Sequence, residues 1–160
     1  MEGNGNLRAR MTELKAANTW RPSAQCDAPE LGDDAFIHVR SMSMALRREL
    51  MTLRSQNERV EKTLAPLYEM QDAGTEKHAE TGESVADLIE RYEGQQVSAE
   101  QWEAFSVKVI VETACDGNGQ PYFTSVEDFE EAELPASLRD RLSVAGLDAS
   151  NGNTGTAGND

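Results

Sequence analysis

The chain contains few cysteines, the residues that form disulfide bonds and bind structural zinc. Its 160 residues include two cysteines, Cys26 and Cys115, which lie far apart and form no Cys-x-x-Cys pair. Two cysteines in this arrangement predict neither a zinc site nor a disulfide framework. We therefore expect reduced thiols, as in a protein of the cytosol.

Long apolar runs and excess positive charge are also missing. No stretch approaches the roughly 18 apolar residues that span a bilayer, and Glu2 with its Gly and Asn neighbours is unlike a signal peptide. The net charge is −14, which argues against nucleic acid as a partner because phosphate binding needs clustered Lys and Arg. We expect a soluble intracellular protein that binds neither membranes nor nucleic acid.

The negative charge is concentrated in the second half of the chain. Residues 1–68 hold ten basic and nine acidic side chains, a net charge of +1, whereas residues 69–160 hold five basic and twenty acidic ones, a net charge of −15. Such asymmetry fits a basic partner surface or, more simply, high solubility. The hydrophobic content of 38% is low, so we expect the folded part to be shorter than the whole chain.

The clearest pattern that is present is an apolar stripe that predicts a long helix. Its members are separated alternately by four and three residues, a spacing that keeps them on one helix face. Ser43 has the side chain of a helix N-cap, and Glu58 precedes Lys62 by four residues, as in an exposed ion pair. Pro66 lacks an amide hydrogen and clashes with the preceding turn, so we expect the helix to end or kink around Leu64 and to cover about 43–65. The stripe consists of Leu46, Leu50, Leu53, Asn57, Val60, Leu64 and Leu67.

This stripe leaves two interpretations open. It could form one strand of a coiled coil, in which Asn57 at a seam position fixes the register. It could instead pack on its own domain, since only about three heptads precede Pro66, and Met44 and Met51 would widen the apolar face. We favour packing within the chain and keep self-association through a helix partner as the alternative.

Weaker signals surround the long helix. Upstream, residues 7–17 favour a short helix. A β segment follows at about 19–40, in which a Gly32–Asp34 turn precedes the alternating run 36–40, and we interpret it as a short hairpin or a single strand. Downstream, residues 71–83 are polar and contain two glycines, which predicts a solvated, mobile loop.

Two helices are predicted after this loop. Ser84 caps the first, which closes at Gly94. The second begins with Ser98 and Gln101, which form a capping box. In this motif, the side chain of each residue accepts a hydrogen bond from the backbone amide of the other. The run Val107–Val111 also alternates like a strand, but the capping box favours a helix. The apolar residues of this helix are Trp102, Phe105, Val109 and Ile110.

The last part of the chain is predicted to be helical and then disordered. Thr124 or Ser125 caps an acidic helical turn. Pro135 fits the first position of a final helix, which we expect to end at Gly146. Residues 148–160 are small and polar, which predicts a disordered tail.

One loop has the spacing of a calcium site without its chemistry. An EF-hand loop needs glycine at its position 6 and favours charged oxygen ligands, but here position 6 is Pro121 and position 5 is the neutral Gln120. We therefore interpret residues 116–119 as a turn. The aligned ligand positions would be Asp116, Asn118, Gln120, Tyr122, Thr124 and Glu127.

Signatures of catalysis and of cofactors are not found in the sequence. His38 and His78 are separated by the long helix and have no Cys or acidic cluster at metal-ligand spacing. The Ser, Cys and His residues form no nucleophile motif, and no glycine-rich phosphate loop follows a strand. The acidic run Glu127–Glu133 is interpreted as a solvated helix face. We predict a protein that is not an enzyme, with no cofactor and no metal.

These signals together predict a mainly α fold with a short N-terminal β segment, that is, a small α+β domain. We expect a flexible N-terminus over residues 1–6, a mainly helical domain over 7–147 and a disordered tail over 148–160. The apolar stripes of the helices are the candidate partner-binding surfaces. The candidate residues are Leu46, Leu50, Leu53, Val60, Trp102 and Phe105.

Two stretches of the chain follow the layout of a known family. The first reads APELGDDAFIHVRSMS and enters the long helix, and the second runs from Phe105 to Leu147. This layout resembles the tail assembly chaperones of long-tailed, siphovirus-type bacteriophages. Pro66 in the long helix departs from the family pattern, as does Leu134-Pro135-Ala136, where members often have Lys-Ser-Ala. The matching positions are Ser43, Cys115-Asp116, Gly117 to Gly119, Tyr122-Phe123-Thr124 and Glu127-Asp128.

The resemblance implies a non-enzymatic assembly factor in the host cytoplasm. Such chaperones are thought to coat the tape-measure protein, keep it soluble and recruit tail-tube subunits, and then to leave before the virion is complete. Members are often also made in a longer form by ribosomal frameshifting near the C-terminus. The competing hypothesis is a structural minor tail or neck protein, or a small coiled-coil adaptor, that stays in the particle.

Overall fold

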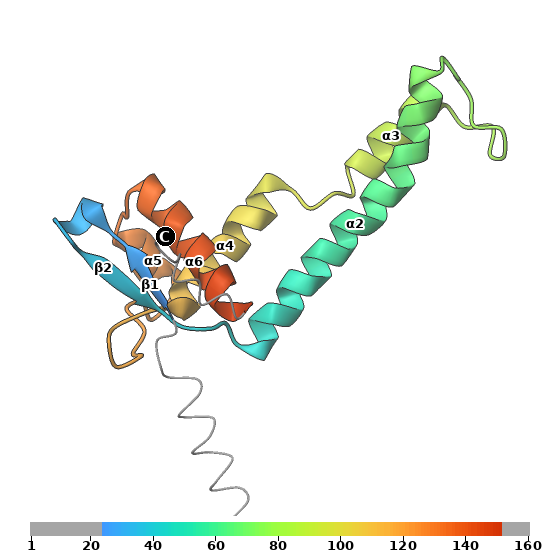
Figure 1. Ribbon diagram of the computed structural model, residues 1–160. Coiled ribbons are helices and arrows are strands. Elements are labelled where there is room, and N and C mark those ends of the chain that lie inside the picture. The colour runs from blue at the N-terminus through green and yellow to red at the C-terminus, as the bar shows by residue number, and fades with distance from the viewer. Residues whose placement is uncertain (1–23, 152–160) are drawn as a thin grey trace, which may run out of the picture. The chain divides into compact units, whose positions relative to one another are not determined.

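A computed structural model of the chain describes residues 24–151 (Figure 1). The predicted mainly α fold with a short β segment is confirmed. The predicted N-terminus over 1–6 and helix over 7–17 lie outside the described residues, as does most of the predicted tail. The elements are β1 (Ala24–Asp27), the 3-10 helix η1 (Pro29–Leu31), β2 (Phe36–Val39), α2 (Met44–Asp72), α3 (Val85–Glu93), α4 (Ala99–Thr113), β3 (Ala114–Cys115), α5 (Val126–Glu131) and α6 (Ala136–Ser150).

The chain divides into two compact units. Unit 1 comprises the residues up to Leu46 and from Ala104 onward, and unit 2 comprises Arg47–Glu103. Both α2 and α4 therefore contribute to each unit. Between residues 24 and 151, no helix is long and apolar enough to cross a membrane.

Unit 1 contains a three-stranded antiparallel sheet in the order β1-β2-β3. Of the two alternatives for the β segment, a hairpin or a single strand, the hairpin is present, since β1 pairs with β2, with Ala24 opposite Val39. The expected alternation in β2 is confirmed, because Ile37 and Val39 are buried whereas Phe36 is exposed. β3 adds to the other side of β2, with Val39 opposite Ala114.

The core of unit 1 lies between this sheet and helices α4, α5 and α6. α6 packs against both β1 and β2, as Figure 1 also shows. Apolar side chains of the hairpin thereby meet the stripes of α4, α5 and α6, which explains why neither the hairpin nor these helices needs to be stable alone. The buried members are Cys26, Ala28, Ile37, Val39, Val107, Ile110, Ala114, Phe129, Leu138, Leu142 and Ala149.

The predicted end of the last helix at Gly146 is wrong, because α6 continues to Ser150. A Cβ atom at Gly146 would lie 2.6 Å from both Thr113 Oγ1 and Val109 Cγ1. This glycine therefore permits close approach of α6 to α4 and does not cap the helix. The predicted start of the tail at residue 148 is wrong for the same reason. Ser150 Oγ fixes the end of α6 by donating to Gly146 O at 2.7 Å and accepting from the amide of Met42 at 2.7 Å.

Gly146→Ala is expected to destabilise the chain. The overpacking against α4 costs about 1–3 kcal/mol, whereas alanine in a helix regains only about 1 kcal/mol. Urea unfolding followed by circular dichroism measures the difference. Gly94→Ala is the control, because a Cβ there would meet carbonyl oxygens of its own helix at an ordinary 3.5 Å. A Gly146→Ala protein as stable as the parent would contradict the close-packing argument.

Unit 2 contains a pair of helices, α2 and α3, with their own core. Figure 1 shows α3 beside the C-terminal half of α2. The stripe of α2 that the sequence analysis identified faces the apolar face of α3, so this half of it packs within its own chain. The buried members are Val60, Leu64, Leu67, Val85, Leu88 and Ile89, with Met70 and Tyr92 partly buried beside them.

The predicted end of the long helix near residue 65 is wrong, because α2 passes through Pro66 and ends at Asp72. Proline inside a helix costs about 3 kcal/mol. Leu67 and Met70 lie beyond it and belong to the core with α3, and burying a side chain of this size contributes about 1.5–3 kcal/mol. Packing therefore offsets the proline, and the following loop begins at residue 73 instead of 71.

The helix caps expected from the sequence are present. Ser84 Oγ accepts from the amide of Asp87 at 3.4 Å. The amide of Gln101 donates to Ser98 Oγ at 3.1 Å, and the amide of Ser98 donates to Gln101 Oε1 at 2.9 Å. This capping box starts α4, which settles the helix-or-strand ambiguity in favour of a helix through Thr113.

Candidate functional site

The residues that carry the family resemblance meet where α4, β3 and α5 join in unit 1. Asp116 Oδ1 accepts from the amides of Asn118 at 2.8 Å and Gln120 at 3.0 Å, and Gly119 has a φ of 79° that favours glycine. The interpretation of residues 116–119 as a turn is confirmed, with the carboxylate engaged by its own loop. Among residues 24–151, no group of three or more His, Cys, Asp or Glu could hold a metal ion.

Arg40 ties this turn to the start of the long helix. Its Nε donates to Glu112 O at 2.8 Å and its Nη1 donates to Gly119 O at 3.2 Å. The carboxylate of Glu112 accepts from the amide of Ser43, and Ser43 Oγ in turn accepts from the amide of Leu46 at 3.2 Å, as its predicted N-cap role requires. The roles of Arg40 and Glu112 could not be predicted from the sequence, since contacts between residues so far apart leave no local signal.

The acidic helix α5 is fixed by a cap and an aromatic contact. Ser125 Oγ accepts from the amide of Asp128 at 3.1 Å, and Asp128 Oδ2 accepts from the amide of Thr124 at 2.9 Å. Behind the cap, Phe123 meets Phe129 edge to face, with ring centroids 5.1 Å apart. Two parts of the family-like stretch thus hold α5 in place. Phe123 anchors it through the ring of Phe129, and Asp128 accepts from the amide of Thr124 at its start.

Glu30 on η1 links the hairpin to α6. Its carboxylate accepts from Ser137 Oγ at 2.6 Å and is paired with the guanidinium of Arg141. The hydrogen bond from Ser137, followed by that from Arg141, lowers the pKa of Glu30 to about 2 from an ordinary 4.5. Arg141 also donates through Nε to Asp27 O at 3.2 Å. In the same region, burial raises the pKa of the Cys26 thiol, which disfavours its reactive thiolate.

Glu30→Gln is expected to lower the melting temperature at neutral pH and to matter less in acid. Because the pKa of Glu30 is about 2 when folded and 4.5 ordinarily, its stabilisation is complete above the ordinary value and is lost as pH falls toward the folded value. Melting curves of parent and variant across this pH range should therefore converge. Glu131→Gln on the exposed side of α5 is the control. A difference between parent and Glu30→Gln that stays constant with pH would contradict the assignment.

Four of the six predicted partner-binding residues are buried within the chain. These are Leu46, Leu50, Val60 and Phe105. Leu53 and Trp102 are half-buried. A role for these six residues in binding a partner stays a prediction, and for the four buried ones it would require the chain to open.

Asn57 has a role inside unit 2. Its Oδ1 accepts a hydrogen bond from the amide of Val97 at 3.0 Å. The residue expected at the seam of a coiled coil is therefore bonded to the backbone of its own chain. The expectation that Met44 and Met51 widen the buried face is wrong, because they are 64% and 67% exposed. Both lie on the face of α2 opposite Leu46 and Leu50, as their helical spacing requires.

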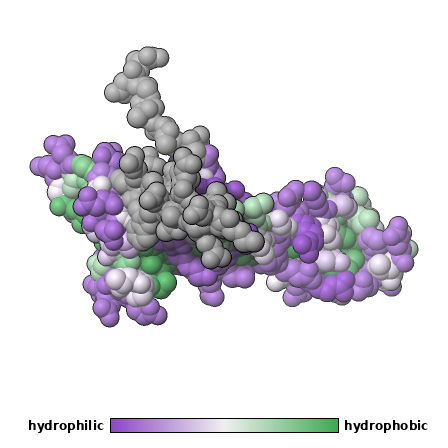
Figure 2. All heavy atoms as spheres, turned by 90° about the horizontal axis from the view of Figure 1, so that it is seen from below, coloured by the Kyte–Doolittle hydropathy of each residue, from purple (hydrophilic) through white to green (hydrophobic). Residues whose placement is uncertain are grey.

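The surface carries scattered apolar side chains. Figure 2 shows one face of the molecule, where hydrophilic residues predominate and hydrophobic ones form small separate areas. Isolated exposed apolar residues are ordinary in proteins. The larger exposed ones in unit 1 are Leu31, Phe36, Met44, Tyr122, Val126 and Val144.

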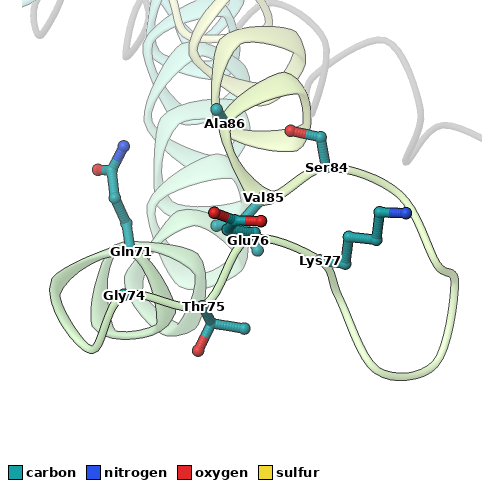
Figure 3. Close-up of a pocket in the computed structure, with 8 residues that line it drawn as sticks. All are labelled: Gln71, Gly74, Thr75, Glu76, Lys77, Ser84, Val85 and Ala86. Carbon is teal, nitrogen blue, oxygen red and sulfur yellow. The ribbon is translucent and has the colours of Figure 1, made fainter.

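Unit 2 has an open hollow of about 470 Å³ between the end of α2 and the start of α3 (Figure 3). The amide of Val85 donates to Glu76 O at 2.9 Å, and Lys77 pairs with Ser84 in an isolated bridge. Figure 3 shows the side chains of Gln71, Thr75 and Lys77 pointing in different directions. Because its polar groups do not converge, the hollow lacks the arrangement that a ligand site needs.

A second groove, of about 380 Å³, lies in unit 1 between β1 and α6. This groove could not be predicted from the sequence, for two reasons. A last helix that ends at Gly146 leaves Asp148 outside it, and a β segment at about 19–40 does not define β1 as a separate strand. The one available signal was Val144, an aliphatic residue off the Leu138–Leu142 stripe.

No protein-family model, curated protein or solved structure matches this chain. The resemblance to tail assembly chaperones therefore depends on the residues quoted above. Those residues occupy connected positions in unit 1, at the start of α2 and around α5.

Proposed function

We propose that this chain is a non-enzymatic tail assembly chaperone of a long-tailed bacteriophage. It binds the tape-measure protein and helps to recruit tail-tube subunits. The observation that carries the proposal is the order of family-like residues in stretches 28–43 and 105–147. Their order, rather than any one residue, makes the resemblance.

The arrangement of these two stretches supports treating them as one feature. They are far apart in the sequence, yet both belong to unit 1. β2 from the first stretch pairs with β3 from the second, with His38 opposite Cys115. Arg40 from the first also donates to Glu112 and Gly119 of the second. A motif whose parts are in contact is more informative than two independent short matches.

The charge of the chain fits the proposed task. The net charge of −14 keeps an assembly with an aggregation-prone helical client in solution and opposes crowding by surplus copies. Five of the 29 acidic residues follow one another closely in the sequence at α5. They are Glu127, Asp128, Glu130, Glu131 and Glu133.

Co-expression with the tape-measure protein encoded nearby tests the proposal. We expect the tape-measure protein to move into the soluble fraction and to co-purify with this chain. A coiled-coil protein of matched length and charge is the control client, which should gain no solubility. A tape-measure protein that stays insoluble and does not co-purify would contradict the proposal.

Mass spectrometry of purified particles separates the chaperone from a structural protein. A chaperone leaves before the particle is complete and should be absent, whereas a minor tail or neck protein should be present in fixed copy number. Presence in mature particles, together with an insoluble client, would identify the chain as a virion component.

A further inference from the structure

β1 is the edge strand of the sheet in the described part of the chain, and part of its backbone faces outward. The amide of Ala28 donates to Ala35 O at 2.8 Å, so Ala28 points toward β2. In an antiparallel pair, alternate residues point the same way. Gln25 and Asp27 therefore point their N–H and C=O groups away from β2. The contact from Arg141 Nε to Asp27 O agrees with this direction.

A groove with an apolar floor lies along this edge. It is lined by Gln25 and Cys26 of β1 and by the side of α6 that faces them, with a volume of about 380 Å³. Val144, one of the lining residues, is 56% exposed. A strand edge beside a helix is an arrangement that proteins use to bind extended peptides, because backbone groups provide pairing and the helix side provides pockets. The lining residues of α6 are Asp140, Arg141, Val144, Ala145 and Asp148.

The charges at the groove decide which occupant fits. Asp140 and Asp148 line it, and Asp27 is exposed at the end of β1. Arg141, the basic residue of the lining, is paired with Glu30. The groove is therefore acidic in net character and complements a basic segment.

The same charges exclude two nearby candidates. A second copy pairing edge to edge would bring like carboxylates together across a two-fold axis, which is unfavourable. The C-terminal residues 152–160 contain no Lys or Arg and end in Asp160, so they offer no positive charge to the groove.

We propose that the groove between β1 and α6 binds an extended, basic segment of a partner protein as an added strand. Outward N–H and C=O groups of Gln25 pair with the segment's backbone. Successive side chains of an added strand point to opposite faces, so every second one points toward α6. These place an aliphatic group on Val144 and, on either side of it, Lys or Arg near Asp140 and Asp148. This site does not depend on the proposed chaperone function.

The test measures binding of a defined peptide to the full chain. The probe is a fluorescein-labelled, acetylated peptide of about six residues, a length that spans the edge. It carries lysine, valine and lysine at alternate positions, which share one face of a strand, and threonine between them. Fluorescence anisotropy should show saturable binding, and the amide NMR signal of Gln25 should shift. Two control peptides should bind at least about tenfold more weakly. One has glutamate in place of lysine, and the other is N-methylated so that it cannot pair as a strand.

A pair of variants locates the site. Val144→Lys places a positive charge in the groove and should weaken binding of the lysine peptide by at least about tenfold. Met51→Lys changes another exposed apolar residue, which lies outside the groove, and should leave binding unchanged. Circular dichroism checks that both variants fold. Equal binding to Val144→Lys, equal binding of the N-methylated peptide, or no saturable binding would each overturn the proposal. In the last case, slow hydrogen exchange at Gln25 in the free chain would identify the chain's own N-terminal residues or a second copy as the occupant.

Discussion

Phe129→Ala is expected to lower the free energy of unfolding by about 3–5 kcal/mol, the range for removing a large buried aromatic side chain. Phe129 is 1% exposed and belongs to the core of unit 1. Its ring meets Phe123 edge to face, and the guanidinium of Arg139 lies 5.0 Å from its centroid. Alanine would lose the buried area, both ring contacts and the anchor that holds α5 to the sheet.

Urea unfolding followed by circular dichroism measures this loss. Tyr122→Ala is the matched control, because Tyr122 is an aromatic residue of the same segment that is 50% exposed, and it should change stability by less than about 1 kcal/mol. Phe129→Leu should recover part of the loss, since it restores apolar volume without the ring contacts. Equal stability of Phe129→Ala and Tyr122→Ala would show that α5 is not anchored as described.

Local signals in the sequence were sufficient to place most helix starts. The capping residues Ser84, Ser98 and Ser125 accept hydrogen bonds from first-turn amides as expected. A cap depends on residues within one turn, so its chemistry is readable without knowledge of the fold. The apolar stripe from Leu46 to Leu67 was readable for the same reason, because helical spacing alone determines which residues share a face.

Helix ends were less predictable, because two of them depend on distant partners. Pro66 and Gly146 are both strong local stop signals, yet α2 and α6 continue past them. The core with α3 offsets the proline. Gly146 lets α6 approach Thr113 of α4 closely, so this glycine lies inside the helix and does not end it. Tertiary packing outweighs local propensity at both positions.

The sheet and the groove were not predictable in detail. β3 is two residues long, and its pairing with β2 joins segments that α2, α3 and α4 separate along the chain. Arg40 connects those segments through hydrogen bonds to carbonyl groups, and such contacts leave no pattern along the chain. The groove between β1 and α6 forms only when both elements are folded together. Its lining residues are far apart in the sequence, so no sequence pattern could group them.

Leu64→Ala is expected to lower the free energy of unfolding of unit 2 by about 2–5 kcal/mol, as for other fully buried leucines. Leu64 is 1% exposed in the core that α2 forms with α3. Truncation would leave a cavity between two helices, and α3 has nine residues and depends on docking for its stability. Met51→Ala on the exposed face of α2 is the control and should have little effect.

The dependence on protein concentration makes this variant decisive for the coiled-coil alternative. If Leu64 packs against α3 of its own chain, the variant unfolds at a lower midpoint than the parent, and neither midpoint changes with protein concentration. If the stripe instead pairs two copies, the parent's midpoint rises with concentration by mass action, and Leu64→Ala weakens association. Asn57 accepts from the amide of Val97 of its own chain, which favours packing within the chain. A concentration-dependent midpoint that Leu64→Ala removes would instead make α2 an association helix and favour the adaptor over the chaperone.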